Sequence, residues 1–152
     1  PFLAINTQTN SANTGYNLIT KYPRVDYFCI DEPEIRLATR ERFGPLEDLI
    51  VRVAGHADSA RAAVTRGHLG SITYSRDGGF HRIPVLSQKI VDRVGAGDAY
   101  LSITSPCVAA GLPMDLVGFI GNAAGALAVA IVCNRSPIEP VALFKFISSL
   151  PK

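Results

Sequence analysis

The chain has 152 residues, which is long enough for one domain with a sizeable hydrophobic core. Hydrophobic residues make up 47% of it and charged residues 18%, a balance that excludes a disordered polar chain. The net charge is +2 and the basic residues are scattered, so charge gives no case for nucleic-acid binding and no such partner is expected.

Cysteine usage and hydropathy indicate a cytoplasmic globular protein. Cys29, Cys107 and Cys133 lie in apolar runs without the spacing of metal ligands, so we expect buried free thiols in a reducing cytosol. The most apolar stretch, residues 116–133, is rich in Ala and Gly and contains Asn122, which favours a buried helix over a membrane span. No membrane partner is therefore expected.

The chain starts at Pro1 and runs directly into an apolar segment. Residues 2–7 are typical of a buried strand, and a natural domain seldom begins inside a core strand. We therefore expect residues 1–152 to be the C-terminal part of a larger protein.

Periodicity and turn residues predict the elements of the first half of the chain. After a polar loop at residues 8–17, a strand is expected at 25–30. Pro33 suits the first turn of the helix that follows. Gly44-Pro45 then stops that helix. The ranges expected to be helical are 33–43, 45–54 and 59–66.

The second half is predicted to contain a hairpin and then three helices. Strands at 71–75 and 80–85 flank the turn signal Asp77-Gly78-Gly79. Residues 89–91 lead into a Gly-rich turn, and the expected helices span 97–110, 115–132 and 140–149. Strands that alternate with helices indicate an α/β fold with a mainly parallel sheet.

The Gly-rich turn, D-R-V-G-A-G-D at residues 92–98, carries the strongest chemical signal. Gly95, Ala96 and Gly97 stand at a helix start, where backbone N–H groups and the helix dipole stabilise phosphate. Asp98 beside them can accept a proton from a hydroxyl that attacks a phosphoryl group. The alternative is a plain strand-to-helix turn with Asp98 as an N-terminal cap.

This segment resembles the D-T-x-G-A-G-D signature of the ribokinase-like (PfkB-type) carbohydrate kinases. The resemblance implies that Asp98 is the catalytic base and that Gly95, Ala96 and Gly97 form the anion hole. It implies a ribokinase-like three-layer α/β/α fold, of which residues 1–152 are the C-terminal nucleotide-binding and catalytic part. ATP and Mg²⁺ are the implied cofactors, with a monovalent cation and a homodimer as further candidates. Arg93 departs from the family's Thr.

Asp31, Glu32 and Glu34 form an acidic cluster at the end of a predicted strand, the edge at which open α/β sheets place ligands. Carboxylates there can hold Mg²⁺ beside nucleotide phosphates. The run D-E-P-E is similar to the family's N-x-x-E, with Asp31 in place of the Asn. The alternative is that these acids only interact with the dipole of the helix that they start.

Three further segments are similar to the family's nucleotide-binding pattern. The run T-Y-S-R-D-G is aligned with T-x-G-x-x-G, with Thr73 and Gly78 matching and Ser75 replacing a Gly. Asn122 precedes an alanine run that in the family lies near the adenine, and Asn134 stands near a family Gly. The alternatives are an ordinary hairpin edge for the first segment and an amide satisfied by backbone for Asn122.

Other polar residues are interpreted as structural. The run at residues 8–13 is interpreted as a surface loop, although it follows a strand at a possible ligand edge. His56, His68 and His81 show no ligand spacing and are expected in loops or at the surface.

The leading hypothesis is an ATP-dependent phosphotransferase that acts on a hydroxyl of a small sugar or sugar phosphate. Little activity is expected from residues 1–152 alone, because the family's sugar-contacting residues lie mainly in its N-terminal half, which we expect as a partner for this chain. The run S-P-I-E at residues 136–139 is similar to the heptose-phosphate kinase part of fused kinase/nucleotidyltransferases.

A second hypothesis is a non-catalytic nucleotide-binding or interaction module with a degenerate kinase fold. Arg93, Asp31 and Ser75 support it, because each departs from the family pattern. A Rossmann dehydrogenase is excluded, because no G-x-G-x-x-G follows the first predicted strand.

Overall fold

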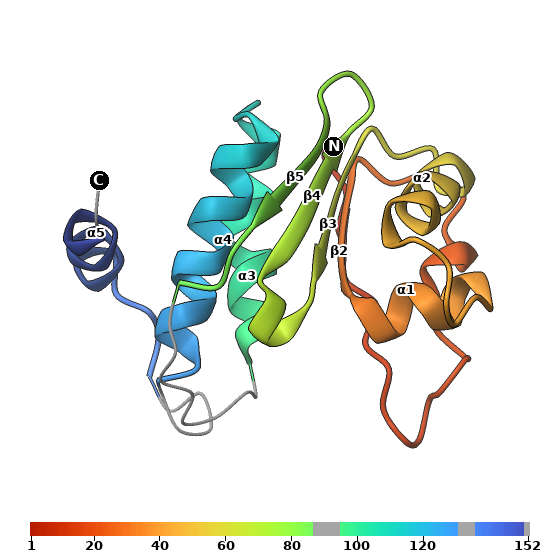
Figure 1. The fold of residues 1–152 in the computed structure, drawn as a ribbon, viewed down its shortest axis with the longest axis horizontal. Coiled ribbons are helices and arrows are strands. Elements are labelled where there is room, and N and C mark those ends of the chain that lie inside the picture. Colours follow the sequence, from red (N-terminus) through yellow and green to blue (C-terminus); the bar gives the residue numbers. More distant parts are fainter. Residues whose placement is uncertain (87–94, 131–135, 151–152) are drawn as a thin grey trace.

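The computed structural model describes residues 1–86, 95–130 and 136–150. Helices lie on both faces of a central sheet, so the chain forms three layers in the order α/β/α (Figure 1). The two helices α1 and α2 cover one face and α3 and α4 cover the other, with α5 beyond α4. The expected α/β architecture is confirmed.

Among the described residues the sheet has five strands in the order β1-β2-β3-β4-β5, so each of these strands pairs with its neighbour in sequence. The first three, β1 (Ala4–Ile5), β2 (Tyr27–Asp31) and β3 (Arg61–Thr65), are parallel. β4 (Ser71–Ser75) is antiparallel to β3, and β5 (Gly79–Ile83) is antiparallel to β4, which confirms the predicted hairpin. Of these five described strands, four share one direction and β4 is reversed, so the sheet is mixed.

Two α-helices and a short 3-10 helix pack on one face of the sheet. α1 (Glu32–Thr39) follows β2 directly, and α2 (Leu46–His56) packs beside it. The 3-10 helix η1 (Ile19–Lys21) contacts both. α1 ends earlier than the predicted residue 43, because Arg40 takes a left-handed conformation with φ 55° and its N–H closes the last turn.

The opposite face is covered by α3 (Ala96–Ala109) and α4 (Met114–Ala128). These two helices make the most extensive contact between elements of the described chain. α5 (Pro140–Ser149) packs on α4 rather than on the sheet. All three agree with the predicted helices to within a few residues, and no helix in the described part of the chain is long and apolar enough to cross a bilayer.

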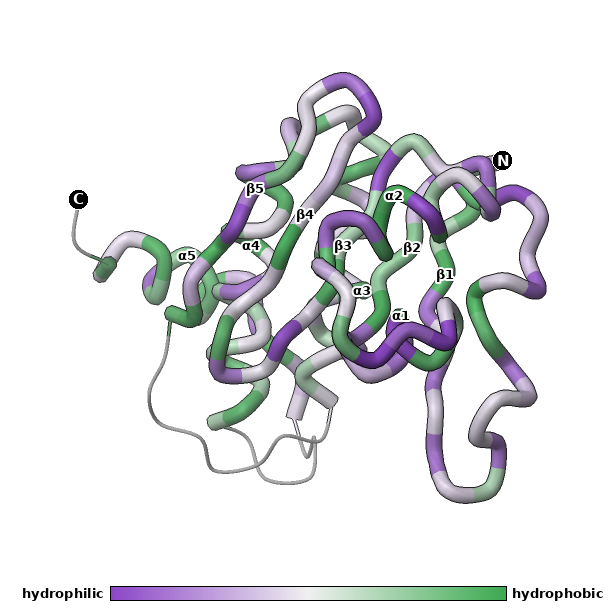
Figure 2. Tube along the Cα trace, turned by 45° about the vertical axis from the view of Figure 1, so that its right-hand side comes forward, coloured by the Kyte–Doolittle hydropathy of each residue, from purple (hydrophilic) through white to green (hydrophobic). Residues whose placement is uncertain are grey.

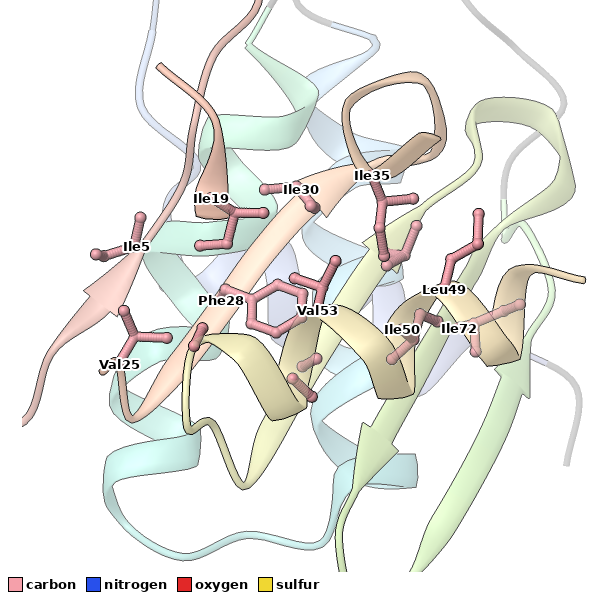
Figure 3. Close-up of a cluster of buried hydrophobic side chains, with 14 of the residues drawn as sticks. Ile5, Ile19, Val25, Phe28, Ile30, Ile35, Leu49, Ile50, Val53 and Ile72 are labelled. Carbon is pink, nitrogen blue, oxygen red and sulfur yellow. The ribbon is translucent and has the colours of Figure 1, made fainter. Parts of the chain in front are cut away.

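The core between the sheet and the α1/α2 layer is aliphatic and aromatic (Figure 3). Phe28 and Ile30 of β2 point into it, together with Ile35 of α1 and Ile50 and Val53 of α2. These side chains are at most 1% exposed, and full burial of such a side chain stabilises a fold by about 1.5–3 kcal/mol. This cluster is therefore the main source of stability on that face.

Alternate residues of the same strands face α3 and α4. Tyr27 and Cys29 of β2 and Ala63 of β3 pack there against Val108 and Val117. This period of two is what a strand buried on both faces requires. The hydropathy of the chain follows this arrangement, with hydrophobic residues in the strands and a hydrophilic turn between β4 and β5 at the top of Figure 2.

The prediction of a helix at residues 59–66 is wrong, because the structure has strand β3 there. Ala62, Ala63 and Val64 are 0% exposed, since helices cover both faces of the sheet at this strand. The helix propensity of alanine exceeds that of most other residues by only about a few tenths of a kcal/mol per residue. Packing of the strand between two helical layers outweighs that preference. Small side chains in the middle of a sheet let both helical layers approach.

Candidate active site at the carboxyl ends of the parallel strands

A cavity of about 500 Å³ opens at the carboxyl ends of β1, β2 and β3. Its walls also include the start of α3 and the middle of α4. Parallel strands of an α/β sheet commonly bind ligands at this edge. The lining includes Gln8 and Thr9 after β1, Asp31 and Glu34 after β2, the segment between β3 and β4, residues 95–98 and Tyr100 of α3, and Asn122, Gly125 and Val129.

The predicted anion-binding turn lies at this cavity. Gly95 is the residue before α3 and has φ 84°, a left-handed conformation that glycine adopts without strain. Ala96 and Gly97 begin the helix, and Ala99 N–H already donates to Gly95 O at 2.9 Å. The N–H groups of the first helical turn have no partner within the helix, and the helix dipole adds positive potential there. Gly95, Ala96, Gly97 and Asp98 all line the cavity, and Asp98 is exposed.

Two of the three predicted acidic residues lie on the cavity wall. Asp31 caps α1, because its Oδ1 accepts the Glu34 N–H at 2.7 Å, while Glu34 Oε2 accepts the Asp31 N–H at 2.9 Å. This reciprocal capping box fixes both carboxylates. Glu34 Oε1 also accepts the Thr9 N–H at 2.9 Å, so it ties the loop after β1 to α1. Burial raises the pKa of both carboxyl groups above their ordinary values.

Glu32 is not part of the cavity lining. Its Oε1 accepts hydrogen bonds from Arg36, and its Oε2 accepts one from Arg66 Nε at 2.8 Å. Burial opposes ionisation of Glu32, but these hydrogen bonds and the two guanidinium charges outweigh it and lower its pKa. Glu32 therefore belongs to an ion cluster with Arg36 and Arg66. Asp31 and Glu34, in contrast, line the cavity.

The described residues contain no group of three or more His, Cys, Asp or Glu side chains arranged to enclose a metal. Mg²⁺ needs less than that, because it is usually bound through one or two carboxylates, waters and substrate phosphates. Asp31 and Glu34 supply carboxylate oxygens of that kind on the cavity wall, and Asp98 supplies another at the start of α3. The donor set fits magnesium beside a phosphate.

The structure does not bring Thr73, Ser75 and Gly78 to the cavity. Thr73 is 0% exposed and donates to Met114 O at 2.8 Å, while Ser75 Oγ accepts the Gly78 N–H at 3.0 Å. Because β4 is the reversed strand, its carboxyl end and the turn after it lie at the opposite edge of the sheet. The substitution of Ser75 for a family Gly thus has no bearing on the cavity.

The cavity is lined instead by the segment between β3 and β4, which sequence reasoning missed. Thr65, Gly67, His68 and Gly70 line it. They belong to T-R-G-H-L-G, which has the T-x-G-x-x-G spacing in full and begins eight residues before Thr73. Gly70 has φ 82°, and a Cβ there would lie 2.0 Å from Ile83 O, so only glycine fits. The intact spacing was the signal available in the sequence.

Asn122 lines the cavity, and its side-chain amide is hydrogen-bonded to other residues of the protein. Its Nδ2 donates to Ile83 O at 3.0 Å and to Pro84 O at 2.8 Å, and its Oδ1 accepts from Ser71 Oγ at 2.9 Å. The backbone-satisfied alternative therefore describes its contacts. Asn134, Cys133 and the predicted segment at 89–91 lie outside the described residues, as does Arg93.

Polar residues after β1 and one histidine were also missed. Asn6, Gln8 and Thr9 line the cavity, because β1 is parallel to β2 and ends at the same edge. His68 lines it from the T-R-G-H-L-G segment. Cys29 is a free thiol on the cavity floor, and burial raises its pKa to about 12, so it stays protonated near neutral pH.

The comparisons with known proteins agree with this geometry. The pfkB family of carbohydrate kinases matches residues 10–138. The chain is 34% identical over 120 residues to 2-dehydro-3-deoxygalactonokinase from Haloferax volcanii, an alignment that covers 78% of this chain and 37% of that protein. It is 32% identical over 89 residues to the bifunctional protein HldE from Geobacter metallireducens, with 59% of this chain and 18% of that protein covered.

Solved structures show the same fold. Ribokinase from Thermotoga maritima has a TM-score of 0.80 at 18% identity over 97% of this chain and 49% of its own. A putative Ribokinase II from E. coli in complex with ATP and Mg²⁺ has a TM-score of 0.66 at 25% identity, over 82% of this chain and 39% of its own. The expected ribokinase-like fold is confirmed, and the chain spans about a third or less of the curated relatives named above.

Proposed function

Because this chain belongs to the pfkB family of carbohydrate kinases, we propose that it is the ATP-binding and catalytic part of a sugar kinase. The whole protein transfers the terminal phosphoryl group of ATP to a hydroxyl of a sugar or sugar phosphate. One observation carries this proposal: the 95–98 turn starts α3 at the cavity that also contains the Asp31 and Glu34 carboxylates. An anion site, a base and metal-binding oxygens thereby share one cavity.

Asp98 is the proposed catalytic base. Its carboxylate accepts the proton of the sugar hydroxyl as the oxygen attacks the γ-phosphorus of ATP, and ADP leaves. Backbone N–H groups at Gly95, Ala96 and Gly97 stabilise the negative charge on the transferring group. Asp98 is exposed at the cavity, so a substrate hydroxyl can reach it without any movement of the core.

Asp31 and Glu34 are the proposed magnesium-side residues, acting directly or through water. When bound, Mg²⁺ neutralises charge on the ATP phosphates and stabilises the transferring group. The capping box holds these two carboxylates in place before any ligand arrives. Glu32 is assigned no metal role, because it does not line the cavity and its charge is paired with those of Arg36 and Arg66.

The T-R-G-H-L-G segment is the proposed nucleotide loop, in place of Thr73, Ser75 and Gly78. Thr65 offers a hydroxyl and Gly67 and Gly70 offer close approach of backbone to a phosphate or ribose. Asn122, Gly125 and Ala126 of α4 and Val129 directly after it form another part of the lining, where Gly125 and Ala126 leave room for a flat base.

The substrate class is proposed from the relatives. One relative is named 2-dehydro-3-deoxygalactonokinase, so a sugar acid is the first candidate. The resemblance of S-P-I-E at residues 136–139 to heptose-phosphate kinases makes a heptose phosphate the second candidate. The chain covers only 37% of the first relative, and we infer that residues 1–152 alone phosphorylate little. A non-catalytic nucleotide-binding module is the competing proposal, supported by Asp31 where the family has Asn and by Arg93.

Calorimetry with ATP and Mg²⁺ on the full-length protein, followed by ADP release with a panel of sugars, tests the proposal. We expect binding and sugar-dependent ADP release that is lost in Asp98→Asn while ATP affinity is retained. Binding without transfer to any sugar supports the non-catalytic module. Absence of ATP binding contradicts both, and leaves the 95–98 turn as a purely structural feature.

A further inference from the structure

A chain of buried hydroxyl groups crosses the α3/α4 side of the sheet beneath the cavity. Tyr100 OH donates to Ser71 Oγ at 3.2 Å, and Ser71 Oγ donates to Asn122 Oδ1 at 2.9 Å. Asn122 Nδ2 continues the chain to the carbonyl oxygens of Ile83 and Pro84. Three helix and strand segments, α3, β4 and α4, are thereby joined to the end of β5. Each hydroxyl in the chain has one proton, and each proton has one acceptor.

The ring of Tyr100 is tightly packed, so its hydroxyl group has a fixed position. It is 2% exposed, and a Cβ on Gly121 of α4 would lie 2.5 Å from its Cε2 and Cζ atoms. The ring therefore lies flush against bare helix backbone, with Thr104 at the same contact. Burial raises the pKa of the Tyr100 hydroxyl well above its ordinary value, so it remains a proton donor at neutral pH.

The two ends of this chain lie next to the two glycine-containing segments of the cavity. Tyr100 is two residues after Asp98, within the first two turns of α3. Ser71 directly follows Gly70, the last residue of T-R-G-H-L-G, and Gly70 packs against Ile83 O too closely for any side chain. The Tyr100–Ser71 hydrogen bond thus spans 29 residues of sequence between the 95–98 turn and the 65–70 segment.

We propose that Tyr100 and Ser71 are positioning residues that hold the 95–98 turn at a fixed distance from the 65–70 segment. The inference depends on the proposed function, in which the first segment carries the base and anion site and the second contacts the nucleotide. Phosphoryl transfer needs both in place at once, and small displacements of a reacting group reduce its rate steeply. Tyr100 also lines the cavity, whereas Ser71 does not, so Ser71→Ala tests the same link from a residue outside the lining.

Tyr27 provides a matched control within the same layer. It is 0% exposed, and its hydroxyl lies 3.0 Å from Thr104 Oγ1 of α3, which itself donates to Tyr100 O. Tyr27→Phe therefore removes one buried hydroxyl bond to α3, as Tyr100→Phe does. It leaves the Tyr100–Ser71 hydrogen bond in place, because the Tyr27 hydroxyl bonds Thr104 and neither atom of that link.

The kinetic test compares Tyr100→Phe, Ser71→Ala, their double mutant and Tyr27→Phe in the full-length protein. We expect comparable falls in Tm for the two tyrosine variants. We expect kcat to fall about tenfold in Tyr100→Phe and Ser71→Ala, with KM for ATP changed less than about threefold, and kcat to change less than about twofold in Tyr27→Phe. Both single mutants remove the Tyr100–Ser71 hydrogen bond, and Ser71→Ala also removes the bond to Asn122. The double mutant should therefore lose little more than Ser71→Ala alone.

Amide hydrogen exchange supplies a readout that needs no activity. Tyr100→Phe should speed exchange at residues 70–72 and 96–100 together, whereas Tyr27→Phe should leave residues 70–72 unchanged. Equal effects of the two tyrosine variants on kcat and on exchange at residues 70–72 would overturn the inference and reduce Tyr100 to a packing residue.

The outcomes separate this inference from the proposed function. If the wild-type protein transfers no phosphoryl group to any sugar, the proposed function fails, and hydrogen exchange alone decides whether the two segments are coupled. If the wild-type protein is an active kinase and Tyr100→Phe retains its kcat, the kinase proposal stands and the positioning role is rejected.

Discussion

The sheet buries one face in hydrocarbon and the other in a mixture of hydrocarbon and hydroxyl groups. On the α1/α2 side the core consists of side chains such as Phe28, Ile50 and Val53. In the described part of the chain, the four fully buried side-chain hydrogen bonds all lie on the α3/α4 side, from Tyr27, Thr73, Tyr100 and Thr104.

The two faces therefore contribute differently: the hydrocarbon face mainly stabilises the fold, and the hydroxyl-containing face also fixes the positions of particular atoms. Hydrophobic burial is roughly proportional to area and tolerates small shifts, whereas a buried hydrogen bond fixes two atoms and is costly to leave unmade. The face with the hydroxyl groups carries α3, whose first residues form the proposed anion site. The directional contacts thus lie on the side that carries the proposed anion site.

The largest effect is expected from Asp98→Asn, which tests the functional side of the comparison. Loss of a general base lowers kcat by about 100- to 10,000-fold, and ATP affinity should stay nearly unchanged. Coupled ADP-release kinetics and calorimetry measure the two quantities. Asp115→Asn is the control, because Asp115 is an exposed acid in the first turn of α4 that does not line the cavity. Equal activity losses in both variants would contradict the assigned base.

The next effect, on the hydrocarbon side, is the loss of stability in Ile50→Ala. Ile50 is 0% exposed, and truncation of such a residue costs about 2–5 kcal/mol of unfolding free energy. The adjacent Val51 is 48% exposed, so Val51→Ala should stay within about 0.5 kcal/mol. Urea unfolding measures both. At temperatures well below its Tm, Ile50→Ala should retain kcat. A large fall in kcat at such temperatures would contradict the view that the α1/α2 face contributes mainly to stability.

A smaller effect is expected from Gly121→Ala, which pushes a methyl group into the held ring of Tyr100. The new Cβ would lie 2.5 Å from that ring, and overpacking of this kind costs about 1–3 kcal/mol. Gly125→Ala, one turn later, meets nothing within 4 Å and should gain up to about 1 kcal/mol from helix propensity. Thermal unfolding of the pair measures the difference. Similar Tm values for both variants would show that Tyr100 can move.

The smallest effect concerns the ion cluster of Glu32, Arg36 and Arg66 outside the cavity. Because the pKa of Glu32 is lowered in the folded protein, the unfolded chain binds its proton more readily. The cluster therefore stabilises the fold above the ordinary pKa of 4.5, and that contribution is lost as pH falls through the folded value. Glu32→Gln should cost less than about 1 kcal/mol at pH 7 and nothing at low pH. A difference in urea midpoint that stays constant with pH would contradict this assignment.

Much of the fold and the central part of the site followed from local patterns. The hairpin around Asp77-Gly78-Gly79 and the start of α3 after Gly95 are set by short-range backbone preferences, so turn residues were sufficient to predict them. The acidic residues after β2 were placed by the rule that parallel strands end at the ligand edge, and Asp31 and Glu34 line the cavity. The roles of these residues remain predictions.

The T-x-G-x-x-G spacing at residues 65–70 was overlooked because strand β3 was predicted as a helix. With residues 59–66 taken as a helix, Thr65 did not stand at a strand end, and the T-x-G-x-x-G pattern was assigned to the next strand along. The link from Tyr100 to Ser71 was beyond sequence reasoning, since it depends on how α3 packs across the sheet. Gln8 and Thr9 were likewise set by the pairing of β1 with β2.

The reversal of β4 makes the molecule convenient to engineer. Its amino end supplies Ser71 to the cavity side, and its carboxyl end turns at Arg76, Asp77 and Gly78, at the far edge of the sheet. These three residues are exposed, and exposed polar turns are the sites at which insertions are best tolerated. A dye, an affinity tag or a fused reporter placed at Asp77 would therefore lie about one strand length from the cavity, at the end of the strand that begins directly after the cavity residue Gly70.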